Sequence, residues 1–264
     1  MKTLLLLLLL TLIASCQTKK ETQPTGTKKL VWSEEFDYTG LPDSTKWQYE
    51  EGLVRNNEAQ FYTRARLKNT HVENGILTIT AHKEDFEGSS YTSASINTKG
   101  LYEFTYGRIE VRAKLPEGRG TWPAIWTLGT NIDSVDWPQC GEIDIMEFVG
   151  YDSNKVYANV HTGDYNHAKG TGRGGSITVE KPFADFHIYA VEWYADSLNF
   201  YFDDKRYFTC VSKKEGVGEW PFFEPQYLLI NLAIGGAWGG VKGIDDSIFP
   251  VNYQIDYVRI YSFD

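Results

Sequence analysis

Three carboxylates occur close together in an otherwise apolar segment of the chain. The segment CGEIDIMEFVG contains Glu142, Asp144 and Glu147. Its isoleucines, methionine and phenylalanine predict a buried strand, in which a carboxylate is costly unless it has partners or a function. Strand alternation places Glu142 and Asp144 on one face and Glu147 on the other. A one-residue β-bulge at Ile145 or Met146 would return Glu147 to the face of the other two acids, and such bulges are common beside active sites.

A row of two long acids around a short one suits glycoside hydrolysis. Glu142 and Glu147 can lean toward each other over Asp144. A retaining glycosidase needs two carboxyl groups about 5–5.5 Å apart, one as nucleophile and the other as acid and then base. The middle acid couples the titration of the row and keeps one Glu protonated near neutral pH. A solvated acidic edge strand and a calcium site are alternatives that fit the same spacing.

Further stretches accompany GEIDIMEF in order along the chain: NNEAQFYT, YGRIEVRAKLPEGRGTWPAIWTLG, VHTG, AVEW, LLINLAIGGAWGG and IDYVRIY. Together, over roughly Leu30 to Asp264, they resemble glycoside hydrolase family 16 in its laminarinase-type branch, which has one extra residue before the second Glu. The resemblance implies a retaining endo-β-1,3-glucanase of laminarin-type glucans that needs no catalytic cofactor. Glu142 is then the nucleophile, Glu147 the acid/base and Asp144 the supporting acid.

Two other functions fit the same sequence. Family members with this fold and bulged triplet act on mixed-linkage β-glucan, agar or carrageenan, and loop residues decide among these substrates. A surface glycan-binding lipoprotein without catalysis is the alternative from another class. The intact row of acids argues against it, because such binding modules usually lack one of them.

Segments of period two recur along the chain, whereas no helical period of useful length follows the N-terminal apolar run. They predict an all-β single domain with strands at Ile76–Ala81, Arg108–Leu115, Glu142–Phe148, Val156–Thr162, Phe186–Tyr194, Leu198–Phe202, Tyr227–Ala233 and Gln254–Tyr261. The family resemblance sharpens this pattern to a jelly-roll β-sandwich of two antiparallel sheets, the concave one carrying the substrate cleft.

Four tryptophans lie in segments rich in Gly and Pro or in a loop, where core packing does not explain all of them. They are Trp122, Trp126, Trp137 and Trp238. Flat indole faces match the C–H faces of sugar rings, and the indole N–H can reach a hydroxyl. By resemblance, Trp122 and Trp126 line the subsites that flank the scissile bond. Core packing stays open for Trp126.

The resemblance adds four polar residues to the substrate-binding set. Asn56 resembles a residue that contacts a sugar on the non-reducing side, and His161 one that reaches the cleft near the acid/base. Glu110 and Arg112 lie on a strand that, in the family, looks into the cleft beside the catalytic strand. The alternation of that strand also fits a solvent-exposed face, and a lone histidine is more often structural than catalytic.

A structural calcium site is a further implication of the resemblance. Its ligands would be Asp256, a residue near Glu35 and a backbone carbonyl near Gly75, and such oxygen ligands suit calcium. A salt bridge from Asp256 to Arg259 or another base is the alternative. The five histidines show no spacing typical of a zinc site.

The N-terminus is typical of an export signal. Residues 1–15 combine a lysine with an apolar run that is too short to span a bilayer. The sequence IASC resembles a bacterial lipobox, which makes Cys16 the lipidated first residue of the mature protein; an ordinary signal peptide is the alternative. Residues 16–29 contain almost no hydrophobic side chain and predict a flexible tether to residues 30–264. We therefore expect a protein held by lipid to a membrane of the bacterial cell envelope, on the periplasmic or cell-surface side of the outer membrane.

The net charge and the cysteine content limit the kinds of partner and compartment that fit this protein. The net charge of −9 argues against nucleic acid and against an anionic membrane surface. We expect a monomer whose partner is a polysaccharide and whose only contact with a membrane is the lipid. Cys140 and Cys210 could pair in an oxidising compartment or remain buried thiols, and the sequence does not decide between the two.

Overall fold

The computed structural model describes residues 27–264. The predicted signal segment, the lipidated Cys16 and most of the predicted tether lie outside the described residues. Lys28 and Lys29, the last two residues of the predicted tether, pair with Phe263 and Ser262 and so belong to the folded part of the chain. Within residues 27–264, no helix is long and apolar enough to cross a membrane.

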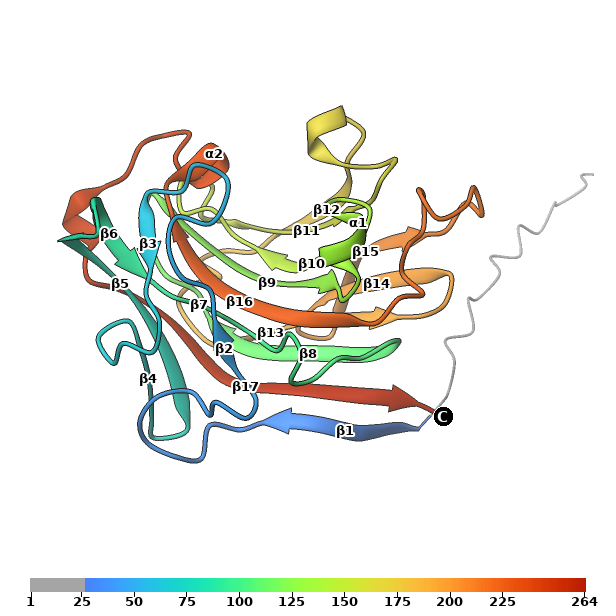
Figure 1. The fold of residues 1–264 in the computed structure, drawn as a ribbon, viewed down its shortest axis with the longest axis horizontal. Coiled ribbons are helices and arrows are strands. Elements are labelled where there is room, and N and C mark those ends of the chain that lie inside the picture. Colours follow the sequence, from blue (N-terminus) through green and yellow to red (C-terminus); the bar gives the residue numbers. More distant parts are fainter. Residues whose placement is uncertain (1–26) are drawn as a thin grey trace, which may run out of the picture.

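Two stacked sheets form the molecule (Figure 1). The smaller sheet has the order β12-β11-β10-β9-β16-β7-β2. The larger sheet has the order β15-β14-β13-β8-β17-β5-β6-β3, with β1 beside β17 and β4 beside β5. All pairs are antiparallel except β3 with β6. The predicted two-sheet β-sandwich is therefore confirmed.

The strands of the smaller sheet are β2 (Gln48–Tyr49), β7 (Ser95–Asn97), β9 (Thr121–Gly129), β10 (Glu142–Glu147), β11 (Lys155–His161), β12 (Arg173–Thr178) and β16 (Gln226–Ile234). Those of the larger sheet are β1 (Lys28–Glu34), β3 (Gln60–Tyr62), β4 (Thr70–Glu73), β5 (Ile76–Phe86), β6 (Ser89–Ser93), β8 (Gly107–Lys114), β13 (His187–Trp193), β14 (Ser197–Phe202), β15 (Lys205–Val211) and β17 (Val251–Phe263). The short helices are α1 (Ile132–Val135), α2 (Gly236–Gly239), η1 (His167–Lys169) and η2 (Asp246–Ile248).

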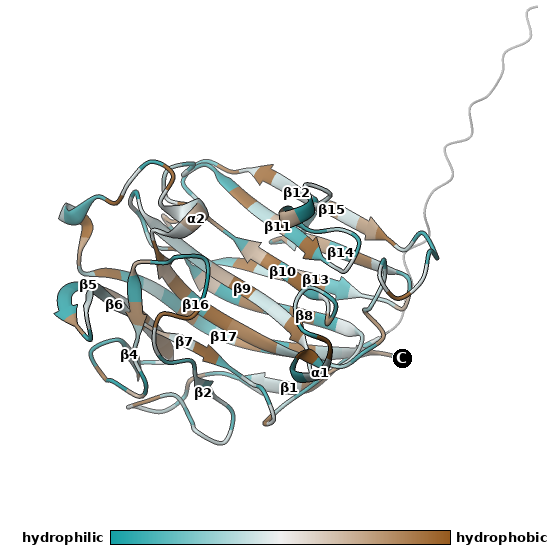
Figure 2. Cartoon of the chain, turned by 45° about the horizontal axis from the view of Figure 1, so that its top comes forward, coloured by the Kyte–Doolittle hydropathy of each residue, from teal (hydrophilic) through white to brown (hydrophobic). Residues whose placement is uncertain are grey.

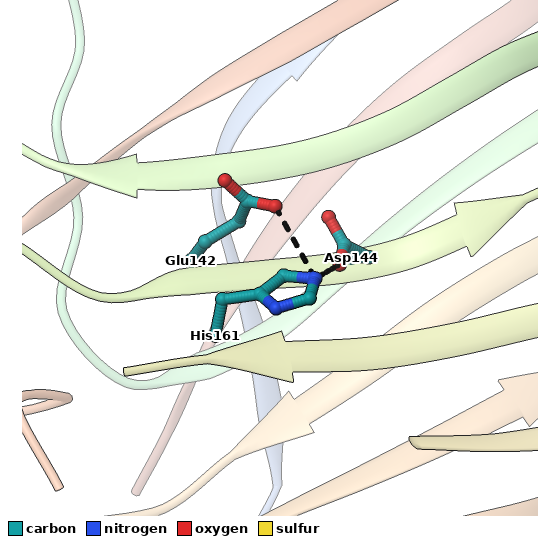
Figure 3. Close-up of side chains that lie close together, drawn as sticks. All are labelled: Glu142, Asp144 and His161. Atoms are coloured by element: carbon teal, nitrogen blue, oxygen red, sulfur yellow. Dashed lines mark ion pairs between the residues drawn. The ribbon is translucent and has the colours of Figure 1, made fainter. Parts of the chain in front are cut away.

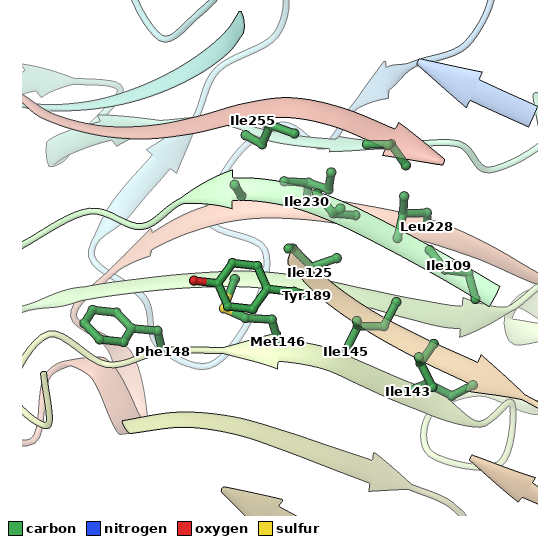
Figure 4. Packing of buried hydrophobic residues seen from close by; sticks show 14 of the residues in the cluster. Ile109, Ile125, Ile143, Ile145, Met146, Phe148, Tyr189, Leu228, Ile230 and Ile255 are labelled. Atoms are coloured by element: carbon green, nitrogen blue, oxygen red, sulfur yellow. The ribbon is translucent and has the colours of Figure 1, made fainter. Parts of the chain in front are cut away.

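The main hydrophobic core fills the space between the two sheets. From β10 it receives Ile143, Ile145 and Met146, which are fully buried. Figure 4 shows these side chains together with Tyr189 of β13 and Ile109 of β8, which come from the opposite sheet. Hydrophobic and hydrophilic bands alternate along the strands in Figure 2, as expected for sheets with one face in the core. The apolar face of β10 thus anchors the strand that carries the acids.

The expected position of Glu110 and Arg112 is wrong. Their strand, β8, lies in the larger sheet between β13 and β17, and does not neighbour β10. The apolar face of β8 points into the core, so these two polar residues lie on the outer face of the larger sheet. There Glu110 accepts a hydrogen bond from Arg108 Nε at 2.9 Å. Arg112 donates to Asp256 Oδ2 at 2.5 Å.

Both described cysteines are unpaired and buried. Cys210 belongs to the core between the sheets, whereas Cys140 packs in a second cluster with Trp126 and Tyr227. Burial raises the pKa of each thiol to about 11. Of the two arrangements that the sequence allows, the fold has the buried thiols, and both are protonated and unreactive at neutral pH.

Candidate active site

A β-bulge in β10 sets the direction of the catalytic acids. On the β9 side, Asp144 pairs with Trp126 and Met146 pairs with Ile125, so Ile145 has no partner of its own. The register with β11 is shifted in the same interval. The side chains of Ile145 and Met146 therefore both enter the core, and Glu147 returns to the outer face. The predicted bulge is confirmed.

The three acids lie in an open cleft with a volume of about 840 Å³ on the outer face of the smaller sheet. In Figure 1, α1 and α2 rise above this sheet on opposite sides. The cleft also brings together six predicted substrate-binding residues, which are Asn56, Trp122, Trp126, Trp137, His161 and Trp238. Of the predicted binding residues, only Glu110 and Arg112 lie elsewhere.

Glu142 and Asp144 share a histidine. His161 Nε2 lies 3.2 Å from Asp144 Oδ2 and 3.7 Å from Glu142 Oε1, as Figure 3 shows. The other oxygen of Glu142 accepts a hydrogen bond from Trp137 Nε1 at 2.8 Å. These contacts fix the orientation of the Glu142 carboxyl group on the floor of the cleft.

Glu147 is held by two neutral donors. Trp122 Nε1 donates to Oε1 at 3.1 Å, and Asn159 Nδ2 donates to Oε2 at 2.6 Å. Asn159 lies opposite Gly174 of β12. A Cβ atom at Gly174 would overlap the Asn159 amide, so the glycine leaves space for the side chain that orients Glu147.

The row of acids cannot carry its full negative charge. Burial raises the pKa of all three carboxyl groups, those of Glu142 and Asp144 well above their usual range. The Asp144 charge raises the pKa of Glu142 further, and the Glu147 charge does the same for Asp144. For Glu147, the hydrogen bonds from Asn159 and Trp122 act in the opposite direction. The row therefore retains protons to a higher pH than solvated carboxyl groups do, and this favours a general acid.

Trp126 belongs to the cleft and is nearly buried at the same time. Its indole Nε1 donates to Asn231 Oδ1 at 2.8 Å, and only 7% of the residue is exposed. The Arg55 guanidinium covers the ring, with Cζ 4.8 Å from the ring centroid. The sequence leaves open whether Trp126 belongs to the cleft or to the core. In the structure it is a tightly packed residue that lines the cleft.

Several cleft residues were not predicted from the sequence, namely Glu50, Arg55, Glu58, Asn159, His167, Tyr227 and Asn231. Asn159 could have been found, because it precedes His161 by two positions and so shares its face of β11. Glu58 belongs to the same NNE stretch as Asn56. For Arg55 and Asn231, no local pattern indicates that the loop and β16 meet Trp126.

The predicted calcium ligands lie near one another but have other partners. Pairing of Glu34 with Val258 and of Leu77 with Ile255 brings Glu35 and Gly75 close to Asp256. Glu35, however, accepts two hydrogen bonds from Arg259, at 2.9 and 2.8 Å. The Asp256 carboxylate pairs with Arg112. A cation bound here would have to replace both ion pairs.

A cleft across one sheet of a β-sandwich, with acids of two roles on its floor, defines a hydrolase that cleaves carbohydrate chains. Comparison with known proteins identifies the family. The profile of glycosyl hydrolases family 16 matches residues 57–259. A beta-glucanase of Rhodothermus marinus is 49% identical over 242 residues, which is 88% of this chain and 85% of that protein. The chain therefore belongs to glycosyl hydrolases family 16.

Solved structures agree with this assignment. The laminarinase from Rhodothermus marinus superimposes with a TM-score of 0.88 at 46% identity, covering 91% of this chain and 99% of that chain. SCLam, a non-specific endo-β-1,3(4)-glucanase, superimposes with a TM-score of 0.85 at 41% identity, covering 90% and 92%. The jelly-roll fold and the family that the sequence predicts are thus both confirmed.

The hydrogen bond from Asn159 predicts a measurable pKa change. Replacing Asn159 with Ala removes a donor that stabilises ionised Glu147, so the pKa of Glu147 should rise further. Titration of the Glu147 carboxyl carbon by ¹³C NMR measures this directly, and Thr209→Ala, on the outer strand β15, is the control. A Glu147 pKa that falls or stays constant in Asn159→Ala would contradict the role of this hydrogen bond.

Proposed function

We propose that the protein is a retaining endo-β-1,3-glucanase that hydrolyses internal bonds of laminarin-type glucans. The observation that carries the proposal is the bulge in β10, which brings Glu142 and Glu147 to the same face in an open cleft. Similarity to a laminarinase over 91% of the chain supports the choice of substrate.

Hydrolysis proceeds in two steps that use carboxyl groups and water. In the first, Glu142 attacks the anomeric carbon, the bond to the glycosidic oxygen breaks, and Glu147 gives its proton to that oxygen. In the second, Glu147 takes a proton from water, and the water oxygen displaces Glu142 from the anomeric carbon. Two displacements at one carbon give net retention.

Asp144 and His161 support the nucleophile. Asp144 lies between the two glutamates, where its repulsion and its hydrogen bond with Glu142 couple their titrations. His161 contacts both Glu142 and Asp144, and a positive charge on it favours the ionised form of Glu142. The family resemblance assigns Glu147 as the acid that gives its proton to the leaving oxygen.

A broader glucanase is the second candidate. It is favoured by the similarity to SCLam, a non-specific endo-β-1,3(4)-glucanase. Action on a galactan such as agar or carrageenan, and glycan binding without catalysis, stay alternatives to be tested by the products.

Replacing Glu142 with Ala should abolish hydrolysis, because the nucleophile is lost while the cleft remains. The measurement is chromatography of oligosaccharides after incubation of residues 27–264 with laminarin, mixed-linkage glucan, agarose and carrageenan. Wild-type protein should release oligosaccharides from laminarin, and Glu142→Ala should release none.

Asp144→Asn should retain some activity with a displaced pH profile, since it removes one titrating group of the row.

Each other outcome of that experiment has a definite meaning. Near-normal turnover by Glu142→Ala would rule out Glu142 as the nucleophile. Products from a galactan alone would overturn the substrate and keep the mechanism. No products from any of the four polysaccharides, with binding retained, would favour the glycan-binding alternative.

The cellular location of the protein is a separate proposal that rests on the sequence of residues 1–29. We propose that Cys16 carries lipid and holds the domain to the outer membrane of the bacterial cell envelope. Replacing Cys16 with Ser should release the protein from the membrane fraction of expressing cells, and labelled palmitate should be incorporated only into the wild type. Palmitate labelling of Cys16→Ser would contradict the assignment.

Calcium and oligomeric state stay predictions. The family resemblance suggests a structural calcium through Glu35, Gly75 and Asp256, whereas the arginine partners of both carboxylates provide charge neutralisation without it. Calcium has no part in the two steps of hydrolysis. The expectation of a monomer rests on the sequence alone.

A further inference from the structure

Glu58 is a buried acid of the cleft that takes no part in the two steps of hydrolysis. It is 8% exposed and lies in the NNE stretch, at the border between the cleft and the loop before β3. Three hydrogen-bond donors converge on its carboxylate. Asn56 Nδ2 donates to Oε1 at 3.2 Å, whereas Gln60 Nε2 and the Tyr62 hydroxyl donate to Oε2 at 2.8 and 3.1 Å. An ionised carboxylate, which accepts at both oxygens, satisfies all three donors.

The backbone presents Asn56 to Glu58 in a fixed way. Asn56 and Asn57 have φ values of 55° and 52°, in the left-handed region that asparagine tolerates better than most residues. The Asn56 carbonyl accepts a hydrogen bond from Ala237 N of α2 at 2.9 Å. Because one N–H of the Asn56 amide is donated to Glu58, the amide has a defined orientation, and its Oδ1 and second N–H remain for other partners.

A second line of hydrogen bonds leads from Glu58 to Trp126. The Tyr62 hydroxyl, which donates to Glu58, accepts from Asn231 Nδ2 at 2.9 Å. Asn231 Oδ1 in turn accepts from Trp126 Nε1. Donors and acceptors alternate in one direction along this line, so the acceptor at its end determines the orientation of every member.

We propose that Glu58 is a positioning residue that prepares the cleft for a neutral, hydroxylated sugar. It fixes the Asn56 amide with Oδ1 as acceptor for a sugar hydroxyl, and it holds the Trp126 ring through Tyr62 and Asn231. This inference rests on the proposed function, because it concerns how the same cleft recognises a glucan. Arg55 pairs with Glu50, so the charge that remains at this end is that of Glu58, and it disfavours a sulfated or carboxylated sugar.

The charge state of Glu58 then affects substrate binding. The charged or titratable groups that face it are Arg55, the Arg55 partner Glu50, and Tyr62. Burial raises the pKa of Glu58, and the hydrogen bonds together with Arg55 oppose that rise. When the pH falls through this raised pKa, Glu58 gains a proton and becomes a donor at one oxygen. The oxygen that carries the proton is then a weaker acceptor, and its O–H faces groups that are themselves donors.

The test is the substitution Glu58→Gln, which keeps the shape and replaces one acceptor by a donor. KM for laminarin should rise about tenfold, the cost of one hydrogen bond to a charged group, whereas kcat should stay nearly unchanged. The KM of the wild type should increase on acidification, and that of Glu58→Gln should be high at every pH. The control is Glu34→Gln, which alters a buried acid of β1, far from the cleft, that accepts from Phe36 N. It should lower stability without changing KM.

Two further measurements separate positioning from general support of the fold. In an Asn56→Ala background, Glu58→Gln should raise KM by less than it does alone, because part of its effect passes through Asn56. The proposal would be overturned if the fold-changes in KM caused by the two substitutions multiply fully. It would also be overturned if KM is unchanged in Glu58→Gln.

The second measurement needs no substrate. The indole N–H resonance of Trp126, identified by its loss in Trp126→Phe, should shift with pH in the wild type and shift less in Glu58→Gln, where only the neighbouring row of acids still titrates. If no glucan is hydrolysed by the wild type, the proposed function fails while this resonance still decides the role of Glu58. A Trp126 resonance that responds neither to pH nor to Glu58→Gln would overturn the proposal.

Discussion

The unpaired position of Ile145 in β10 is the constraint on which the active site depends. Without it, regular alternation would send Glu147 into the core between the sheets, where a carboxylate has no partner. With it, Ile145 and Met146 both fill the core, and the acids emerge on one face. The strand can tolerate this irregularity because β9 and β11 hold it on both sides. A local break in pairing thus serves the chemistry, while the apolar face of the strand retains its packing.

Burial of three acids in one row has a cost that the surrounding residues offset in part. Each carboxyl group has a raised pKa, so the folded state binds more protons than the unfolded state between the unfolded and folded pKa values. Stability contributed by the row therefore falls as the pH rises through that window. Neutral donors on Glu147 and the histidine beside Glu142 limit the loss. The same environment keeps a proton available for the leaving oxygen, which a solvated row could not do.

More of the active site than of the strand order in the two sheets can be predicted from the sequence. The mismatch in phase of Glu147 predicts the bulge, and all eight strands expected from period-two segments are present. The sheet to which β8 belongs is not predictable, since Glu110 and Arg112 alternate with apolar residues in the same way on the outer face of either sheet. β9 is not predicted as a strand, because Pro123 argues against a central strand. In the structure, the Pro123 carbonyl nevertheless accepts a hydrogen bond from Phe148 N.

Contacts between distant segments account for the remaining residues that the sequence does not reveal. Arg55 covers Trp126, and Asn231 joins Tyr62 to the same indole. These residues come from a loop, β9, β16 and β3, and only the sandwich brings them together. Local patterns describe faces of strands, whereas the walls of this cleft are built where several strands and loops meet.

The stereochemistry of the first product is the sharpest test of the role of the bulge. If the bulge brings Glu142 and Glu147 close enough for a covalent glycosyl-enzyme, ¹H NMR during the first minutes of laminarin hydrolysis should show the β-anomer of the new reducing end, followed by slow mutarotation. Appearance of the α-anomer first would mean inversion, which needs carboxyl groups roughly 6.5–9.5 Å apart. That result would contradict a mechanism in which Glu142 is the nucleophile and Glu147 the acid/base.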